Sequence, residues 1–161
     1  MKKEIEDKVQ HLINETRVMT LAVSNNNIPW SSPVYFLFHN NAFYFFSNKS
    51  SRHIKYAENK KIIAASIFQD SDKIDQIFGF QMSGKLEKIS QSPLYLLIVK
   101  KYIAKFNFLK QLFGSQIIDN KDFFLEKFKS HLFCFYPDQI FLSDNSNRDD
   151  NRSAIDLRKI S

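Results

Sequence analysis

Two asparagine-rich turns divide the first third of the chain into short apolar segments, and this pattern limits the possible folds more than any other feature. Asn25-Asn26-Asn27 follows one segment, and Asn40-Asn41 follows the next. Asparagine tolerates the left-handed backbone that tight turns need. The pattern therefore predicts strands over residues 17–24, 30–38 and 42–47, joined as an antiparallel meander.

A predicted helix precedes this meander. Ile5, Val9, Leu12 and Ile13 recur at helical spacing with charged residues between them. They form one apolar stripe on an amphipathic helix, and we expect that stripe to close the core. Pro33 lies inside the second predicted strand. Because proline has no N–H, that strand is either an edge strand or bulged at this point.

The remainder of the chain alternates between helical and extended patterns. We expect a segment over residues 48–59 that is polar at first and then helical, and further helices over residues 93–105 and 122–129. Strands are expected over residues 62–68, 77–89, 131–136 and 139–143, the last two paired around Pro137-Asp138. Ser50 is the expected N-cap of the first of these helices, and Gly79 and Gly84 mark expected bends or bulges. A mainly β, α+β fold satisfies this order best, as a nearly closed antiparallel barrel with helices outside it.

The totals set further bounds. The 161 residues suffice for one domain, which we place over residues 1–143, with a polar tail over residues 144–161. The 17 Phe against only 3 Gly favour a β-rich core. The single cysteine, Cys134, lies in an apolar run and is expected to be a small buried hydrophobe. The four histidines show no metal-ligand spacing.

Location and charge are less decisive. The charged N-terminus lacks an apolar signal core and no apolar stretch is long enough to cross a bilayer, so we expect a cytoplasmic protein without membrane partners. The net charge of +6 suits an anionic partner or merely a basic surface. Between Lys85 and Lys110 there are six lysines and one acid, Glu87. A solvated helix face explains this run better than a nucleic-acid footprint.

The segment Ser47-Asn48-Lys49-Ser50-Ser51-Arg52-His53 carries the clearest chemistry, because it lies where a predicted strand ends and a helix begins. The free N–H groups and the dipole at the start of a helix favour an anion. The serines offer hydroxyl donors, and Arg52 offers a forked, permanently charged donor that matches phosphate oxygens. Two interpretations stay open: this segment binds a phosphate, or Ser50 only caps the helix while Lys49 and Arg52 face solvent.

Five ordered segments carry a resemblance to a known family. They are Ile28–Phe38, Phe43–Asn48, Ser51–His53, Ile62–Ile67 and Gly79–Glu87. Together they resemble the pyridoxamine 5'-phosphate oxidase-like family of FMN-binding split barrels, over about residues 16–90. The resemblance implies an antiparallel split β-barrel with flanking helices, and a homodimer with FMN bound between the two subunits.

The resemblance also implies roles for particular residues. Ser47, Ser51 and Arg52 fall where the family holds the FMN phosphate, and His53 stands beside them where a second basic residue, usually Lys, is common. The strand segment Ser31, Ser32, Pro33 and Val34 falls where backbone groups approach the isoalloxazine ring. Gln81 matches the flavin-contacting Gln of the family.

Other positions depart from the true oxidases. No Lys occurs between Val34 and Phe38, and the only tryptophan is Trp30, so the C-terminal Trp and Arg-rich substrate signature is missing. These departures point away from oxidation of pyridoxamine phosphate and toward the small uncharacterised bacterial branch of the family.

The sequence leaves three candidate functions open. The first is an FMN-dependent oxidoreductase acting on a small-molecule substrate, in which the cofactor performs the electron transfer and no catalytic side chain is required. The second is a non-catalytic protein on the same fold that binds flavin, haem or another anionic small molecule. The third is nucleic-acid binding by a basic barrel, which the composition favours least.

Overall fold

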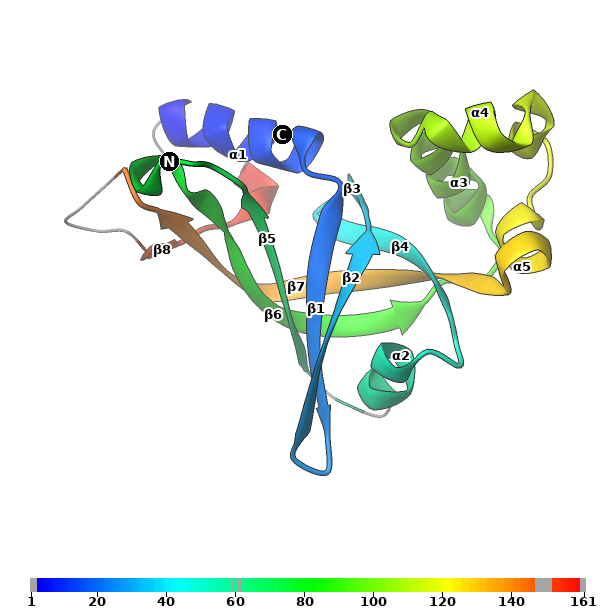
Figure 1. The fold of residues 1–161 in the computed structure, drawn as a ribbon, viewed down its shortest axis with the longest axis horizontal. Coiled ribbons are helices and arrows are strands. Elements are labelled where there is room, and N and C mark those ends of the chain that lie inside the picture. The colour runs from blue at the N-terminus through cyan, green and yellow to red at the C-terminus, as the bar shows by residue number, and fades with distance from the viewer. Residues whose placement is uncertain (1–2, 59, 61, 147–151, 160–161) are drawn as a thin grey trace.

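The computed structural model describes residues 3–58, 60, 62–146 and 152–159, and these form a curled antiparallel sheet with flanking helices (Figure 1). The strands lie in the order β2-β1-β5-β6-β7-β4-β3, and β8 pairs with β7. Their bounds are β1 (Val18–Asn25), β2 (Ile28–Tyr35), β3 (Leu37–His39), β4 (Ala42–Asn48), β5 (Ile63–Gln69), β6 (Phe78–Lys88), β7 (Ser130–Asp144) and β8 (Arg152–Ala154). This is the antiparallel split barrel that the sequence predicts.

The helices fall into two groups. The long helices are α1 (Lys3–Glu15) and α3 (Pro93–Lys105), and the short ones are α2 (Arg52–Ala57), α4 (Phe108–Phe113) and α5 (Phe123–Phe128). Single 3-10 turns occur at Ile74–Gln76, Ser115–Ile118 and Leu157–Lys159. In Figure 1, α1 lies across one end of the curled sheet, and α3, α4 and α5 gather at the other end. We call these three helices the helical lobe.

The asparagine turns form as predicted. Asn26 and Asn27 have φ of 49° and 60°, and Asn40 and Asn41 have φ of 47° and 61°. Two consecutive residues in the left-handed region are the signature of a turn whose twist matches that of the strands it joins. These turns connect β1 to β2 and β3 to β4.

Two hydrophobic cores lie on opposite faces of the sheet. The inner core fills the curl of the sheet beneath α1, and its largest fully buried members include Leu12, Met19, Leu21, Phe36, Phe43, Phe45, Phe80 and Phe135. The outer core lies between the other face of β3, β4 and β7 and the helical lobe, and includes Leu37, Tyr44, Tyr95, Tyr102, Phe106, Phe124, Leu132 and Cys134. Successive residues of a strand point to opposite faces, so β4 and β7 supply both cores.

Three local predictions are wrong. The expected strand over residues 30–38 is divided at Phe36, whose N–H donates to the carbonyl of Arg17 while the chain passes from β2 to β3. The N-cap of α2 is Ser51 rather than Ser50. Gly79 pairs regularly with Phe68 and Ser143 and makes no bulge. A Cβ there would lie 2.5 Å from the carbonyl oxygen of Ile67, so glycine is required by close packing.

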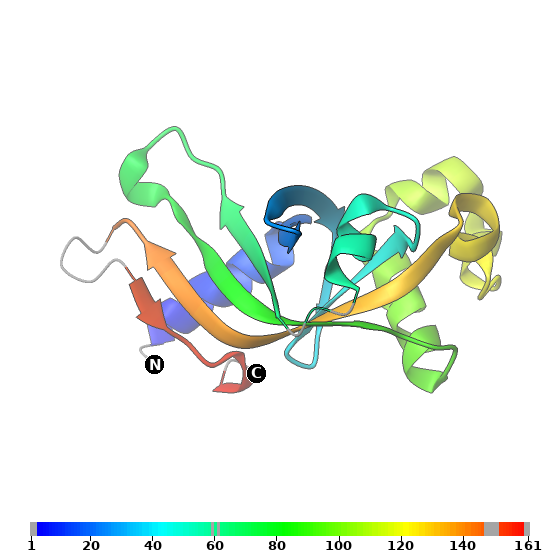
Figure 2. The ribbon, with the colours of Figure 1, turned by 90° about the horizontal axis from the view of Figure 1, so that it is seen from below.

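The two strands expected around Pro137-Asp138 are one continuous strand, β7, which pairs with β6 along both halves. Gly84 pairs with Pro137 and Ser83 pairs with Gln139, so Asp138 is an extra residue in β7. This β-bulge accommodates the proline, which has no N–H for a regular ladder. The bulge expected at Gly84 is therefore confirmed, and Figure 2 shows how strongly β6 and β7 curve together.

Residues 152–159 of the segment expected as a polar tail lie against the sheet. β8 pairs with β7 from Phe141 to Ser143, the N–H of Ile155 donates to the carbonyl of Ile140, and the side chain of Leu157 is buried in the inner core. The division into residues 1–143 and 144–161 stays a prediction.

Candidate functional site

Ser47, Ser51 and His53 form a closed triangle of side-chain contacts, which we call the serine cluster. Ser47 Oγ lies 2.8 Å from His53 Nε2, Ser51 Oγ lies 3.3 Å from the same nitrogen, and the two hydroxyl oxygens are 3.2 Å apart. Ser47 comes from the end of β4, and the other two come from the cap and first turn of α2. The structure therefore joins three of the residues that the sequence places in a phosphate site.

The local backbone explains this grouping. Ser51 takes an extended conformation at the N-cap of α2, yet its side chain makes no capping hydrogen bond. A serine at this position normally accepts from an N–H of the first turn. Here its hydroxyl points toward Ser47 and His53 instead. These two side chains therefore orient the hydroxyl, which makes no capping bond to the helix.

His53 stands where a second basic residue is common in such a site, but it is not an exposed cation. Its side chain is buried, with a relative exposure of 9%, and burial lowers its pKa from the usual 6.5. Desolvation disfavours the charged ring. At neutral pH His53 is therefore an uncharged hydrogen-bonding group within the cluster.

Arg52 lies outside this triangle and is supported by two aromatic rings. Its guanidinium carbon lies 4.2 Å from the centroid of the Trp30 ring and 5.1 Å from that of Tyr56, and Nη2 donates to the Tyr56 hydroxyl at 3.0 Å. Stacking of this kind holds the planar guanidinium in place while leaving its other N–H groups available. Arg52 itself is exposed, so a ligand can reach it.

Trp30 and Tyr56 belong to the site but were not among the predicted residues. A signal for Tyr56 exists in the sequence, because it lies four residues after Arg52 on one helix face. Trp30 has no such signal. It meets Arg52 only because β2 packs beside α2 in the folded sheet.

Helix α2 contributes less than the sequence suggests. It spans only six residues, Arg52–Ala57, within the segment 48–59 that the sequence predicts to be polar at first and then helical. A macrodipole is built from aligned peptide units, so a single short helix supplies a small one. The affinity of the site for an anion rests on its side chains.

The segment Ser31–Val34 lies on the edge strand β2, as Pro33 predicts. Ser32 and Val34 pair with Leu21 and Met19 and share the face of the inner core, whereas Ser31 and Pro33 point to the opposite face. An edge strand presents one row of backbone N–H and C=O groups that no neighbouring strand covers. These groups are suited to contact a ligand ring, which stays a prediction.

Gln81 is exposed on the outer face of β6, in a row with Thr20, Ser66 and Phe141 of the neighbouring strands. Ser47 pairs with His131 of β7, whereas Gln81 pairs with Phe141 of the same strand. At about 3.3 Å per residue, this stretch of β7 separates them by roughly 30 Å. The structure therefore does not bring Gln81 and the serine cluster together within one chain.

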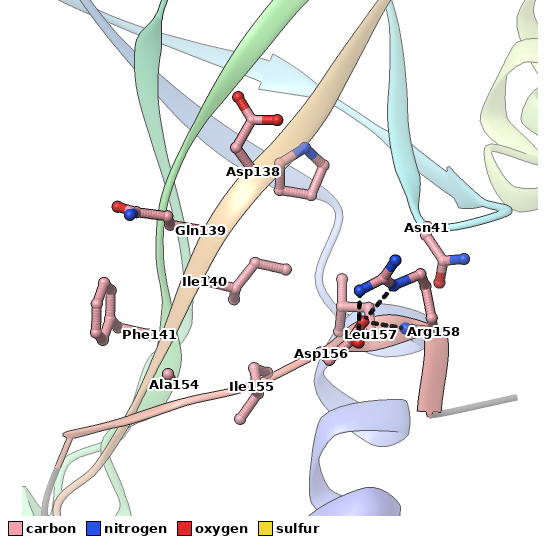
Figure 3. A pocket seen from close by; sticks show the side chains of 11 residues that line it. Asn41, Asp138, Gln139, Ile140, Phe141, Ala154, Ile155, Asp156, Leu157 and Arg158 are labelled. Atoms are coloured by element: carbon pink, nitrogen blue, oxygen red, sulfur yellow. Dashed lines mark hydrogen bonds and ion pairs between the residues drawn. The ribbon is translucent and has the colours of Figure 1, made fainter.

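A separate hollow of about 500 Å³ lies between β7 and the C-terminal segment (Figure 3). Ile140, Phe141 and Ile155 line it, and Arg158 stands at one side. The guanidinium of Arg158 binds both carboxylate oxygens of Asp156, at 2.9 and 2.8 Å. Because this charge is already compensated, the hollow is a poorer anion site than the serine cluster.

The described residues give no sign of a metal site or a membrane span. Within residues 3–58, 60, 62–146 and 152–159, no three His, Cys, Asp or Glu side chains gather around a possible ion. In the same part of the chain, no helix has the length and apolar character needed to cross a bilayer.

Comparison with known proteins identifies the family. The model of the pyridoxamine 5'-phosphate oxidase family matches residues 5–131, which include α1, every strand from β1 to β6 and the serine cluster. The chain belongs to this family. A curated relative, the UPF0306 protein PM1958 of Pasteurella multocida, is 25% identical over 84 residues, and this match spans 51% of the present chain and about half, 56%, of that protein.

Several solved structures share the fold. A Clostridium acetobutylicum protein related to general stress protein 26, of the pyridoxinephosphate oxidase family, gives a TM-score of 0.67 at 12% identity over 100% of both chains. The heme storage protein HutZ of Vibrio cholerae gives 0.64 at 16% identity, over 85% of this chain and 93% of that one. A FAD-binding protein of Mesorhizobium loti gives 0.60 at 12% identity, over 83% and 89%.

Proposed function

We propose that this protein binds FMN between the two subunits of a homodimer and uses it as an oxidoreductase toward a small-molecule substrate. The proposal is carried by the paired hydroxyls of Ser47 and Ser51, together with Arg52 on the adjoining helix α2, in a chain of this split-barrel family. A bound flavin supplies hydride and electron transfer, and the protein supplies binding and orientation.

The donor set fits a phosphate. Two hydroxyl groups and one exposed, ring-supported guanidinium match the donors that phosphate oxygens accept. The cluster is poorer in charge than the family pattern, because His53 is buried and neutral. We therefore expect moderate affinity, with Arg52 as the only full charge in direct contact.

The position of Gln81 supports the homodimer. Within one chain it lies roughly 30 Å along β7 from the serine cluster, at about 3.3 Å per residue. One flavin can meet both only if a second copy of the chain brings its β6 face to the cluster. Exposed apolar residues on the outer sheet face, Val18, Phe68 and Phe141, suit contact with such a copy.

The first experiment is to record the absorbance of the freshly purified protein and to titrate the protein with FMN. The expected result is a flavin spectrum, or one gained on adding FMN, in stoichiometric amount. A colourless protein that ignores excess FMN would remove the proposal. Reduction of the bound flavin by a nicotinamide donor would then test the oxidoreductase role.

Two matched variants locate the site. Arg52→Met removes the guanidinium but keeps an apolar stem, and we expect FMN affinity to fall by about tenfold or more, since a charge-assisted hydrogen bond contributes about 1.5–3 kcal/mol. Lys55→Met removes one charge from an exposed position of the same helix and should leave FMN affinity nearly unchanged. Equal losses in both variants would show a general charge effect instead of a site.

A second function deserves the same test, because HutZ is a heme storage protein with the same fold. In this alternative the chain binds flavin, haem or another anionic small molecule without turnover. A haem absorbance band on adding hemin, or bound flavin that nicotinamide donors do not reduce, would favour this alternative over the oxidoreductase.

A further inference from the structure

The triangle of Ser47, Ser51 and His53 has a fixed supply of hydrogen-bonding protons. A hydroxyl has one O–H and two lone pairs, and a neutral imidazole nitrogen is either a donor or an acceptor. Two side chains of the triangle are buried: Ser47 is 7% exposed and His53 is 9% exposed. The 2.8 Å contact between Ser47 Oγ and His53 Nε2 is therefore a real hydrogen bond whose direction decides what the serines can do.

The two possible directions have different consequences. If Nε2 accepts, the hydroxyl proton of Ser47 points at the ring and is lost to any ligand. If Nε2 carries the hydrogen and donates, Ser47 accepts through a lone pair and its own O–H is free. One of the two hydroxyls still donates in the 3.2 Å hydrogen bond between Ser47 and Ser51, so the other O–H, which the ring no longer needs, is free for a ligand.

We infer that His53 is a positioning residue whose Nε2–H donates to Ser47 Oγ and so leaves one hydroxyl proton of the Ser47–Ser51 pair free to donate to the phosphate of a bound flavin nucleotide. The inference rests on the proposed flavin function. It goes beyond that function because it gives a buried, uncharged side chain the role of selecting a phosphate-bearing ligand over its phosphate-free counterpart.

The surroundings of His53 support an uncharged ring. Helix α2 packs against β1 and β2, and neither strand carries a charged side chain. The nearest cations are Lys49 in the turn, Arg52 and Lys55 on α2, and none of them is a cause of the lowered pKa, for which burial alone accounts. His131, on β7 opposite Ser47, also has a lowered pKa.

The test compares two amide substitutions at one position. The amide nitrogen of glutamine reaches the place of Nε2, whereas that of asparagine stops near Nδ1. We therefore expect His53→Gln to keep the wild-type ratio of FMN to riboflavin affinity within about threefold. His53→Asn should lower that ratio by about tenfold, the effect of one misdirected hydrogen bond to a charged group. Riboflavin affinity itself should stay unchanged in both variants.

A double-mutant cycle asks whether His53 acts through Ser47. Ser47→Ala should lower the FMN to riboflavin ratio, and adding His53→Asn to it should lower the ratio little further. Strictly additive losses would overturn the inference, and so would a His53→Asn variant with the wild-type ratio. His39→Gln is the control, since His39 lies on β3, paired with the first residue of β4 at the end away from Ser47, and its pKa is also lowered by burial.

The two proposals fail in different ways. A wild-type protein that binds neither FMN nor riboflavin overturns the flavin function and this inference with it. A wild-type protein that binds FMN, but whose ratio is insensitive to asparagine at position 53, overturns the inference alone. Quenching of Trp30, the single tryptophan, follows binding directly because its ring lies against Arg52.

Discussion

The two cores of this protein share strands but differ in chemistry. The buried members of the inner core are all Val, Leu, Ile, Met, Ala or Phe, and none of them titrates. The outer core contains Tyr44, Tyr95, Tyr102 and Cys134 among its buried members. Two of these hydroxyls cross between elements: Tyr102 donates to the carbonyl of Tyr35 and Tyr95 donates to that of Lys121, each at 3.1 Å.

This difference explains how the helical lobe is held against the sheet. Apolar burial alone holds the inner core together, and it is non-directional. The outer core adds hydrogen bonds and edge-to-face ring contacts, such as that of Tyr102 with Phe46 at 5.1 Å between centroids, and these fix one orientation of the lobe on the sheet. We expect the inner core to set global stability and the outer core to set the position and pH response of the lobe.

The largest expected effect comes from Phe43→Ala in the inner core. Phe43 is 0% exposed and contacts Phe36 and Phe38, with ring centroids 5.4 and 5.0 Å apart. Removing its ring should lower the free energy of unfolding by about 3–5 kcal/mol, measured by urea denaturation. Phe124→Ala in the outer core should cost less and affect the lobe first. If Phe124→Ala proves the more damaging, the ranking of the cores is wrong.

Lys105→Met tests the contact between helix α3 of the helical lobe and the end of helix α1, which covers the inner core. From the last turn of α3, Lys105 Nζ donates to the carbonyls of Ile13 and Thr16 at the end of α1, at 3.2 and 2.9 Å. Methionine keeps an apolar stem but loses both bonds and the cation–π contact of Nζ with the Phe36 ring, 4.3 Å from the ring centroid. The expected loss in the free energy of unfolding is about 1–3 kcal/mol at pH 7. A variant as stable as wild type would show that burial of the charge already cancels the bonds.

The same lysine makes the stability of the protein depend on pH. Burial, with a smaller contribution from Arg17, lowers its pKa from 10.5 to about 8. Between these values the unfolded chain holds the proton more tightly than the folded one, so the lysine contribution to stability rises with pH from about 8 upward. This rise should be missing in Lys105→Met when stability is measured at a series of alkaline pH values.

Tyr102→Phe is a finer probe of the attachment of the lobe. It removes only the hydroxyl that donates to the carbonyl of Tyr35, and we expect a loss of about 1 kcal/mol. Tyr35→Phe is the matched control, because the Tyr35 side chain is 49% exposed and should lose almost nothing. Hydrogen exchange of the α3 amides should report the change more clearly than global unfolding.

Replacing Cys134 should have the smallest effect on stability at neutral pH and a distinct effect at high pH. Burial raises the pKa of its thiol from 9.0 to about 12, beside Tyr44 and Tyr136. Since the folded pKa exceeds the unfolded one, the stability that the neutral thiol contributes is present below pH 9 and is lost progressively toward pH 12. Cys134→Ala should flatten the alkaline decline, and an unchanged slope would contradict this account.

Local chemistry made much of the fold predictable. The asparagine pairs predicted both hairpins, and Pro93 predicted the start of α3. Pro33 predicted an edge strand or a bulge, and its strand is an edge strand. The continuity of β7 was not predictable, because Pro137-Asp138 has the composition of a turn. Only its pairing with Gly84 of β6, far away in the sequence, makes it a bulge instead.

The same distinction holds for the site. Ser47, Ser51 and His53 are close in sequence, so a strand end followed by a helix suffices to bring them together. The contact of Trp30 with Arg52 depends on how β2 packs beside α2, and no local pattern encodes that. Whether Gln81 joins the site depends on a second chain, which lies beyond what one sequence pattern can specify.

The extra residue in β7 has a consequence for how this strand can evolve. Phe133 and Phe135 reach the inner core before the bulge, and Ile140 and Leu142 reach it afterwards, so odd positions give way to even ones. Asp138 thus acts as a phase shift in an otherwise strict two-residue repeat. Deleting that single residue would remove the bulge and restore the strict repeat, with Pro137 and Gln139 still opposite Gly84 and Ser83 and with Ile140 and Leu142 still facing the inner core. At this position, a change in the length of the strand by one residue leaves its core face intact, whereas a one-residue shift elsewhere would turn every following side chain to the other face.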